Sequence, residues 1–120
     1  MSRLLASAML LLLSALPEGS LARSEVRRLE GTYYFRGATA IDPPPEEARE
    51  THLLLELKGD AARDLYRRMK VRAKPDQCIG AGAMSKTIGG MQCTMLSDTK
   101  YSCHFSIELT RQRIQPGLVC

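Results

Sequence analysis

All four cysteines of this 120-residue chain lie in its C-terminal half. An even number of cysteines in a small exported chain predicts a disulfide framework, whereas a cytosolic chain would use the same residues for metal or redox chemistry. The compartment therefore decides how this half of the chain can fold. The four residues are Cys78, Cys93, Cys103 and Cys120.

The N-terminus has the pattern of a secretory signal peptide. Arg3 is followed by an uncharged 13-residue stretch, Leu4 to Leu16, and small residues at positions 20 and 22 form a cleavage site. This stretch is shorter than the roughly 20 residues that span a bilayer. We therefore expect residues 1–22 to be removed and the mature chain to be secreted or periplasmic, with no membrane span.

Residues 23–120 are expected to form one domain with a thin hydrophobic core. Two disulfides in its C-terminal half would compensate for the small stability that a thin core provides, because each bridge stabilises a fold by about 2–4 kcal/mol. Four cysteines allow three pairings. A last turn that sets Leu109 opposite Ile114 would also set Cys103 opposite Cys120. The disulfides expected on this ground are Cys78–Cys93 and Cys103–Cys120.

A second register stays open. If Met95 lies opposite Tyr101 across the preceding turn, Cys93 falls opposite Cys103. The two remaining cysteines would then pair as Cys78–Cys120.

The periodicity predicts an α+β fold, a small antiparallel sheet with one amphipathic helix packed on it. Alternating apolar residues predict strands, and apolar residues at helical spacing predict a helix capped by Asp60. A Gly- and Ala-rich loop lies between the helix and the final strands. The expected strands are 33–41, 51–57, a short one at 84–88, 91–95, 101–109 and 114–120, and the expected helix is 60–70.

The net charge is +4, and removal of one Arg and one Glu with residues 1–22 leaves it unchanged. Six of the basic residues fall between positions 63 and 74. Such a run is typical of a solvated helix face, and it is also a candidate docking patch for an acidic partner. No aromatic residues are interleaved in a way that would favour nucleic acid. The candidate contacts in this run are Arg63, Arg67 and Lys70.

No catalytic or metal motif is present. Gly80 to Thr87 resembles a phosphate-binding loop but has Ser85 in place of its last glycine. The only histidines, His52 and His104, belong to no zinc or nucleophile motif. We expect no catalytic set, no cofactor and no metal.

A second candidate contact patch lies on the first two expected strands. If these strands pair, alternation sets Tyr34, Arg36 and Leu54 on one sheet face together with His52 and Glu56. Interfaces favour such residues when they are exposed. The helix could equally cover this face.

The sequence favours an exported, non-enzymatic binding protein that docks on another protein outside the cytosol. An inhibitor or immunity protein acting on an extracytoplasmic hydrolase is the specific form, with Lys86 in the Gly- and Ala-rich loop as the first contact. The alternatives are a small exported hydrolase or toxin with scattered acidic and histidine residues, and a structural envelope component. The oligomeric state does not follow from the sequence.

Overall fold

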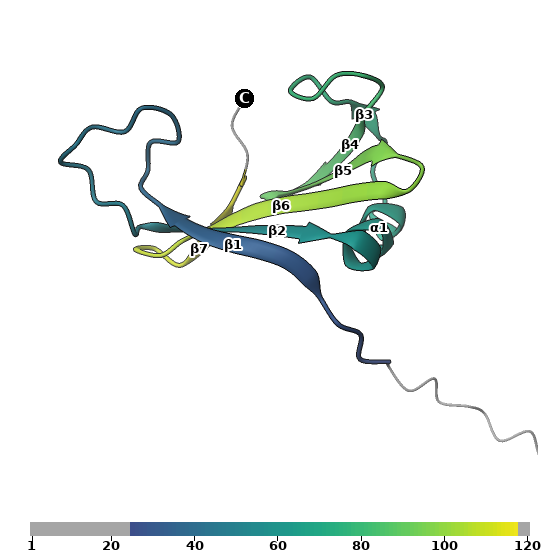
Figure 1. Ribbon diagram of the computed structural model, residues 1–120, viewed down its shortest axis with the longest axis horizontal. Helices are drawn as coiled ribbons and strands as arrows, with labels where there is room; N and C mark the ends of the chain where they lie inside the picture. Colours follow the sequence, from purple (N-terminus) through teal and green to yellow (C-terminus); the bar gives the residue numbers. More distant parts are fainter. Residues whose placement is uncertain (1–24, 118–120) are drawn as a thin grey trace, which may run out of the picture.

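One antiparallel sheet with the strand order β1-β2-β6-β5-β4-β3 forms the body of the domain, and β7 pairs with β6 (Figure 1). The structure, a computed structural model, describes residues 25–117. The expected signal peptide, its cleavage site and Cys120 lie outside the described residues. The elements are β1 (Glu30–Arg36), β2 (His52–Lys58), α1 (Gly59–Arg68), β3 (Lys74–Pro75), β4 (Met84–Ile88), β5 (Met91–Ser97), β6 (Lys100–Glu108) and β7 (Arg113–Gln115).

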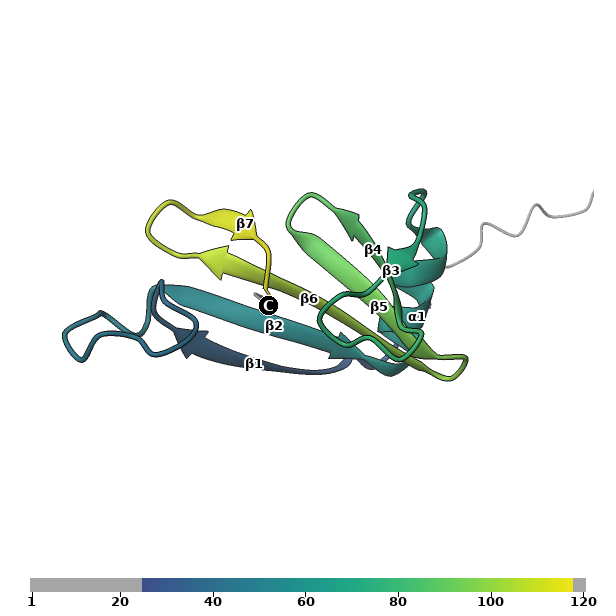
Figure 2. The same cartoon turned by 90° about the horizontal axis from the view of Figure 1, so that it is seen from above.

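Strand β6 organises the sheet because three strands pair with it. On one edge β2 pairs with it from Ser102 to Glu108. On the other edge β5 pairs with its first half and β7 with its last three residues, so that β5 and β7 follow one another along the same side of β6 (Figure 2). The predicted α+β architecture, one helix on a small antiparallel sheet, is confirmed.

Helix α1 spans residues 59–68, against the predicted 60–70. Asp60 was expected to cap it, and this is wrong: the capping position is Lys58, which makes no side-chain cap hydrogen bond. The chain reverses directly after β2 at Gly59, whose φ of 61° is a conformation that glycine adopts readily. This early reversal leaves Asp60 inside the first turn. Its carboxylate there pairs with Arg63 at 3.2 Å.

The core lies between α1 and the adjoining parts of β5 and β6. Ala62, Tyr66 and Met69 face the sheet from the helix side, and all three are buried. The sheet contributes three more buried side chains, and the rings of Tyr66 and Tyr101 lie 5.5 Å apart. The remaining members of this cluster are Cys93 and Cys103, which have no exposed surface.

Cys93 and Cys103 form a disulfide across the β5–β6 hairpin, with Cα atoms 4.0 Å apart. The preferred pairings, Cys78–Cys93 and Cys103–Cys120, are therefore wrong. Met95 does lie opposite Tyr101, which is the register that sets the two cysteines face to face. Cys78 is not a free cysteine.

The last turn explains why the preferred pairing fails. Ile107, not Leu109, lies opposite Ile114. The turn has the expected length but lies one residue earlier, at 109–112, and β7 ends at Gln115 because proline at the next position has no N–H for the ladder. Antiparallel pairing therefore stops before it could continue toward Cys103.

The segment after β7 crosses β6 on the face opposite α1. The Ser106 hydroxyl donates to the carbonyl oxygens of Gln115 at 3.3 Å and Pro116 at 3.0 Å. Gly117 packs directly on the β6 backbone, and a Cβ atom there would lie 2.8 Å from the Phe105 nitrogen. Only glycine allows so close an approach, so the chain is pressed against the sheet at this point.

We predict that the double variant Cys93→Ala/Cys103→Ala unfolds at lower urea concentration, with a loss of about 3 kcal/mol in the free energy of unfolding. The bridge closes a short loop in the unfolded chain, and its sulfur atoms fill the space under Ala62. Urea titration followed by circular dichroism measures the effect. An unchanged free energy of unfolding would contradict this role for the bridge.

Candidate functional site

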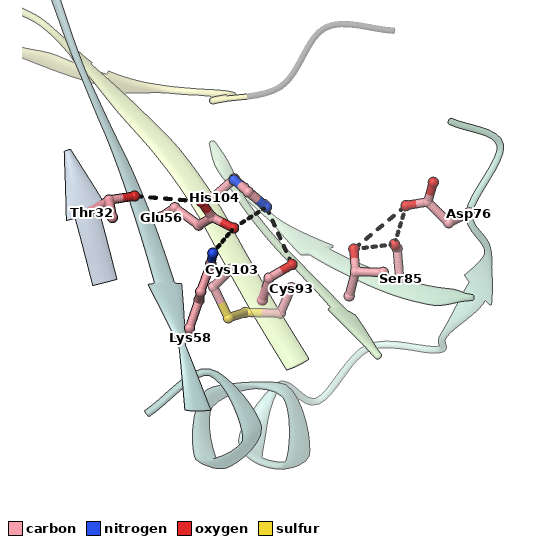
Figure 3. Close-up of polar contacts among 10 residues, drawn as sticks. Thr32, Glu56, Lys58, Asp76, Ser85, Cys93, Cys103 and His104 are labelled. Carbon is pink, nitrogen blue, oxygen red and sulfur yellow. Dashed lines mark hydrogen bonds and ion pairs between the residues drawn. A yellow bond between two sulfur atoms is a disulfide. The ribbon is translucent and has the colours of Figure 1, made fainter. Parts of the chain in front are cut away.

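The two faces of the sheet differ in chemistry. Residues of β2 and β6 alternate between the face that meets α1 and the face that the chain end crosses. The α1 side carries apolar residues along the full length of β6. The opposite side carries hydroxyl, carboxylate and imidazole groups, two clusters of which are drawn in Figure 3.

Apolar side chains on the α1 side form two rows across the strands. One row follows the pairs Phe35–Leu53, Leu53–Ile107 and Ile107–Ile114. The other row joins Tyr33, Leu55 and Phe105 through β1, β2 and β6. We call these residues the apolar face; its members are Tyr33, Phe35, Leu53, Leu55, Phe105, Ile107 and Ile114.

Helix α1 leaves the apolar face uncovered. The helix lies at the end of the sheet where β2 finishes, over Leu57 and the disulfide (Figure 1). Beyond it, Tyr33 keeps 69% of its surface exposed, Phe35 49% and Ile114 65%. The four central members of the face are partly buried. A contiguous apolar surface of this kind on a small domain is a candidate docking surface.

Asp76 anchors the polar cluster at the β3–β4 end of the sheet. Its carboxylate accepts hydrogen bonds from the amides of Cys78 at 2.9 Å and Ile79 at 2.8 Å. The Ser85 hydroxyl donates to it at 2.5 Å, and the Gln92 amide donates at 3.0 Å. Each carboxylate oxygen therefore has at least two donors, and the loop between β3 and β4 is fixed to β4 and β5.

These contacts determine the charge state of Asp76. The Ser85 hydrogen bond, together with those from the Ile79 and Cys78 amides, lowers the pKa of Asp76 although burial opposes it. The carboxylate is therefore ionised at neutral pH. An open groove of about 880 Å³ lies beside it, lined also by Arg72 and Lys74. A carboxylate whose two oxygens already accept several hydrogen bonds is a poor general base. Asp76 is therefore not suited to that role in this groove.

His104 lies in a second polar cluster, opposite Glu56 on β2 (Figure 3). Its Nε2 atom lies 3.2 Å from the Ser102 hydroxyl and 3.9 Å from a Glu56 oxygen. Burial lowers the pKa of His104, and Glu56 raises it by a smaller amount. A serine–histidine–acid relay needs the serine and the acid on different ring nitrogens, whereas here both approach Nε2. The cluster does not have the geometry of a hydrolase triad.

Lys86 occupies a different place from the one that the sequence suggested. Its ammonium group donates to the carbonyl oxygens of Tyr66 at 2.9 Å and Met69 at 3.3 Å, and it lies 4.5 Å from the centre of the Tyr66 ring. These carbonyls close α1, so Lys86 stabilises the negative end of the helix. The loop predicted to carry it is instead the strand 84–88 that the sequence also allowed. The position of Lys86 two residues from both Met84 and Ile88, on the same face of the strand, is the sequence signal that could have indicated a partner on the α1 side.

The predicted patch on β1 and β2 is assembled but largely covered. Tyr34 lies opposite Leu54, as expected from strand pairing. The sequence left the exposure of Leu54 open, and the structure buries it: Leu54 retains 5% of its surface, and it lines a pocket of about 120 Å³ together with Gly117. The Arg36 guanidinium donates to the carbonyl oxygens of Gly37 and Ala38. Of the three predicted contacts, Tyr34 alone is exposed.

The basic run begins on α1 and continues past its end. Arg63 is half-buried and pairs with Asp60 at 3.2 Å and Asp64 at 3.5 Å. Arg67 and Lys70 are exposed. These two cations therefore lie in the solvated C-terminal part of α1 and just after it, where Lys86 of β4 bonds the last carbonyls of the helix.

Within residues 25–117, no three His, Cys, Asp or Glu side chains gather closely enough to hold a metal ion. None of the helices in that range is long and apolar enough to cross a membrane. The chain matches no family model, no curated protein and no solved structure.

We predict that Asp76→Asn lowers the free energy of unfolding by about 2 kcal/mol at neutral pH. The amide of asparagine replaces one acceptor oxygen by an NH2 group, which would face the donors that now bond to that oxygen. The pKa is lowered on folding, so the stabilisation by Asp76 is present above the ordinary carboxyl pKa of about 3.9 and is lost as the pH falls through the folded-state value. The difference between wild type and variant should therefore shrink in acid. Urea titrations from neutral to acidic pH measure it.

The exposed turn residue Asp98 gives a matched control. Asp98→Asn should leave the free energy of unfolding unchanged. A stability of Asp76→Asn equal to that of the control would show that the carboxylate does not anchor the loop.

Proposed function

We propose that this chain is an exported, non-enzymatic binding protein that docks on another protein outside the cytosol through its apolar face. The observation that supports this is the uncovered half of the α1 side of the sheet, with exposed Tyr33, Phe35 and Ile114. A small domain that leaves such a surface open has a partner for it. An inhibitor or immunity protein for an extracytoplasmic hydrolase is the form we favour.

The border of the apolar face indicates the chemistry of the partner. Exposed Arg67 and Lys70 lie in the last turn of α1 and just after it, at the end of the sheet where the helix packs, and the apolar face occupies the part of that side that the helix leaves uncovered. The matching surface is an apolar patch with acidic groups at one end. Charge of this kind at the rim of an interface guides the encounter, while the apolar centre contributes most of the affinity.

Export rests on the N-terminal pattern together with the oxidised hairpin. The Cys93–Cys103 disulfide is compatible with an extracytoplasmic protein. We further propose Cys78–Cys120 as the second disulfide, since the other two cysteines are joined and the chain end is held across β6 by Ser106.

We predict that proteolysis of the secreted protein without reductant yields two linked peptide pairs in mass spectrometry, one with Cys93 and Cys103 and one with Cys78 and Cys120. A free thiol at either Cys78 or Cys120 would contradict the second disulfide. The N-terminal residue of the same secreted protein identifies the cleavage site, which we expect before Arg23.

The docking surface is tested with oxidised mature protein as bait and the extracytoplasmic extract of its host as prey. We predict that a protein is captured in stoichiometric amount and that Ile114→Lys abolishes capture, because a charge at the open end of the apolar face opposes desolvation. Thr87→Lys, which changes another exposed strand position but on the opposite face, should capture as wild type does.

Other outcomes separate the remaining possibilities. Loss of capture in Arg67→Glu with normal capture by Ile114→Lys would move the contact to the basic helix. An activity of the protein alone that is lost in His104→Gln or Glu56→Gln would favour the hydrolase alternative. Absence of both capture and activity would contradict the proposal and favour a structural envelope role.

A further inference from the structure

The three peripheral strands of the sheet are built differently from one another. Strand β3 has two residues, and they are Lys74 and Pro75, both of which obstruct pairing with a further strand. Strand β7 has three residues, and Gly90 of the β4–β5 turn abuts its backbone at Gln115. The fold therefore protects these strands by the means that natural sheets use.

Strand β1 has none of these protections. It pairs with β2 in continuous register over seven residues and, among the described residues, it has no other strand beside it. Its five central residues are uncharged, and none is proline. All three aromatic side chains of the strand are exposed. An open edge that is long, regular and apolar is the form in which a strand pairs with another chain.

The order of residues in β1 makes the strand complementary to itself. Antiparallel pairing centred on Tyr33 sets Glu30 of one copy opposite Arg36 of the other, at both ends of the strand; Arg36 is partly exposed, and its Nη1 atom also donates to the carbonyl oxygens of Gly37 and Ala38. It also sets Gly31 opposite Phe35, so that an aromatic ring covers the backbone of a residue without a side chain, a pairing that stabilises edge glycines. Opposite charges and aromatic pairs directly across a ladder both stabilise it.

Neighbouring registers lack this match. Moving the second strand by two residues in one direction sets Arg36 opposite Arg28, and moving it in the other direction sets Glu30 opposite Ala38. Either shift pairs only five residues of the strand. A shift by one residue would bring apolar side chains to the polar side of the sheet. Only the register centred on Tyr33 pairs all seven residues with opposite charges at both ends.

We propose that β1 is a homodimer interface, with a second copy of this chain as its occupant and Tyr33 on the two-fold axis. The axis is perpendicular to the sheet, so both copies present their α1 side in the same direction. Tyr33 and Phe35 of each copy then join the two apolar faces into one surface. This proposal does not depend on the identity of the partner protein, because Ile114 lies beyond β2 and β6 from the β1 edge.

Cysteine cross-linking of the mature chain tests the register. Residues directly opposite one another in a ladder are within disulfide reach, whereas a two-residue offset places their Cα atoms beyond it. Tyr33→Cys should therefore form a disulfide-linked dimer under mild oxidation. Thr32→Cys and Tyr34→Cys should stay monomeric when oxidised separately and should cross-link with each other when mixed.

Charge exchange provides a second readout, measured by sedimentation over a wide range of concentration. Wild type should be a dimer, and Glu30→Arg should weaken it by about tenfold or more, because two like-charged pairs replace two opposite ones. The double variant Glu30→Arg/Arg36→Glu should restore dimerisation. Circular dichroism confirms that each variant is folded.

A wild-type monomer at every concentration, or a dimer whose cross-links follow another register, would overturn the proposal. Capture of a partner by such a monomer would leave the proposed function intact. Conversely, a Tyr33-centred dimer that captures nothing would contradict the proposed function alone.

Discussion

The position of α1 over the Cys93–Cys103 disulfide is the constraint on which the rest of the structure depends. Ten helical residues extend for about 15 Å, whereas the nine residues of β6 extend for about 30 Å. Because Gly59 starts the helix directly after β2, the helix is confined to one end of the sheet. The core forms there, around Ala62 and the sulfur atoms, and the other half of the same face cannot be covered by this helix.

Local patterns in the sequence predicted the elements well, because they depend on neighbouring residues. The helix, the short strand 84–88 and the β5–β6 hairpin lie where periodicity and turn composition indicated. The disulfide pairing depended on the position of the last turn, because a turn that begins one residue earlier changes the partner of Ile114 from Leu109 to Ile107. Two registers were consistent with the sequence, and only the folded hairpin distinguishes them.

The candidate surfaces were harder to predict, since alternation shows which residues share a face but not which face is covered. Tyr34 and Leu54 were correctly placed together, yet Leu54 is buried, with Gly117 lining the same small pocket, while Tyr33 and Phe35 on the other side stay open. The polar cluster was missed for a related reason. The bonds from Asp76 to the two following amides are local and typical of aspartate in turns, but Ser85 and Gln92 reach it only through the sheet.

The short edge strand β3, which cannot readily pair with a further strand, also affects how this protein behaves at high concentration. Edge-to-edge growth into fibrils requires two compatible strand edges on each molecule, because each copy must pair with one copy before it and one after it. Lys74 and Pro75 leave β3 unfit for that purpose. A β1 contact of the proposed kind would therefore end in a closed pair, because β3 does not offer a second matching edge for open-ended polymerisation.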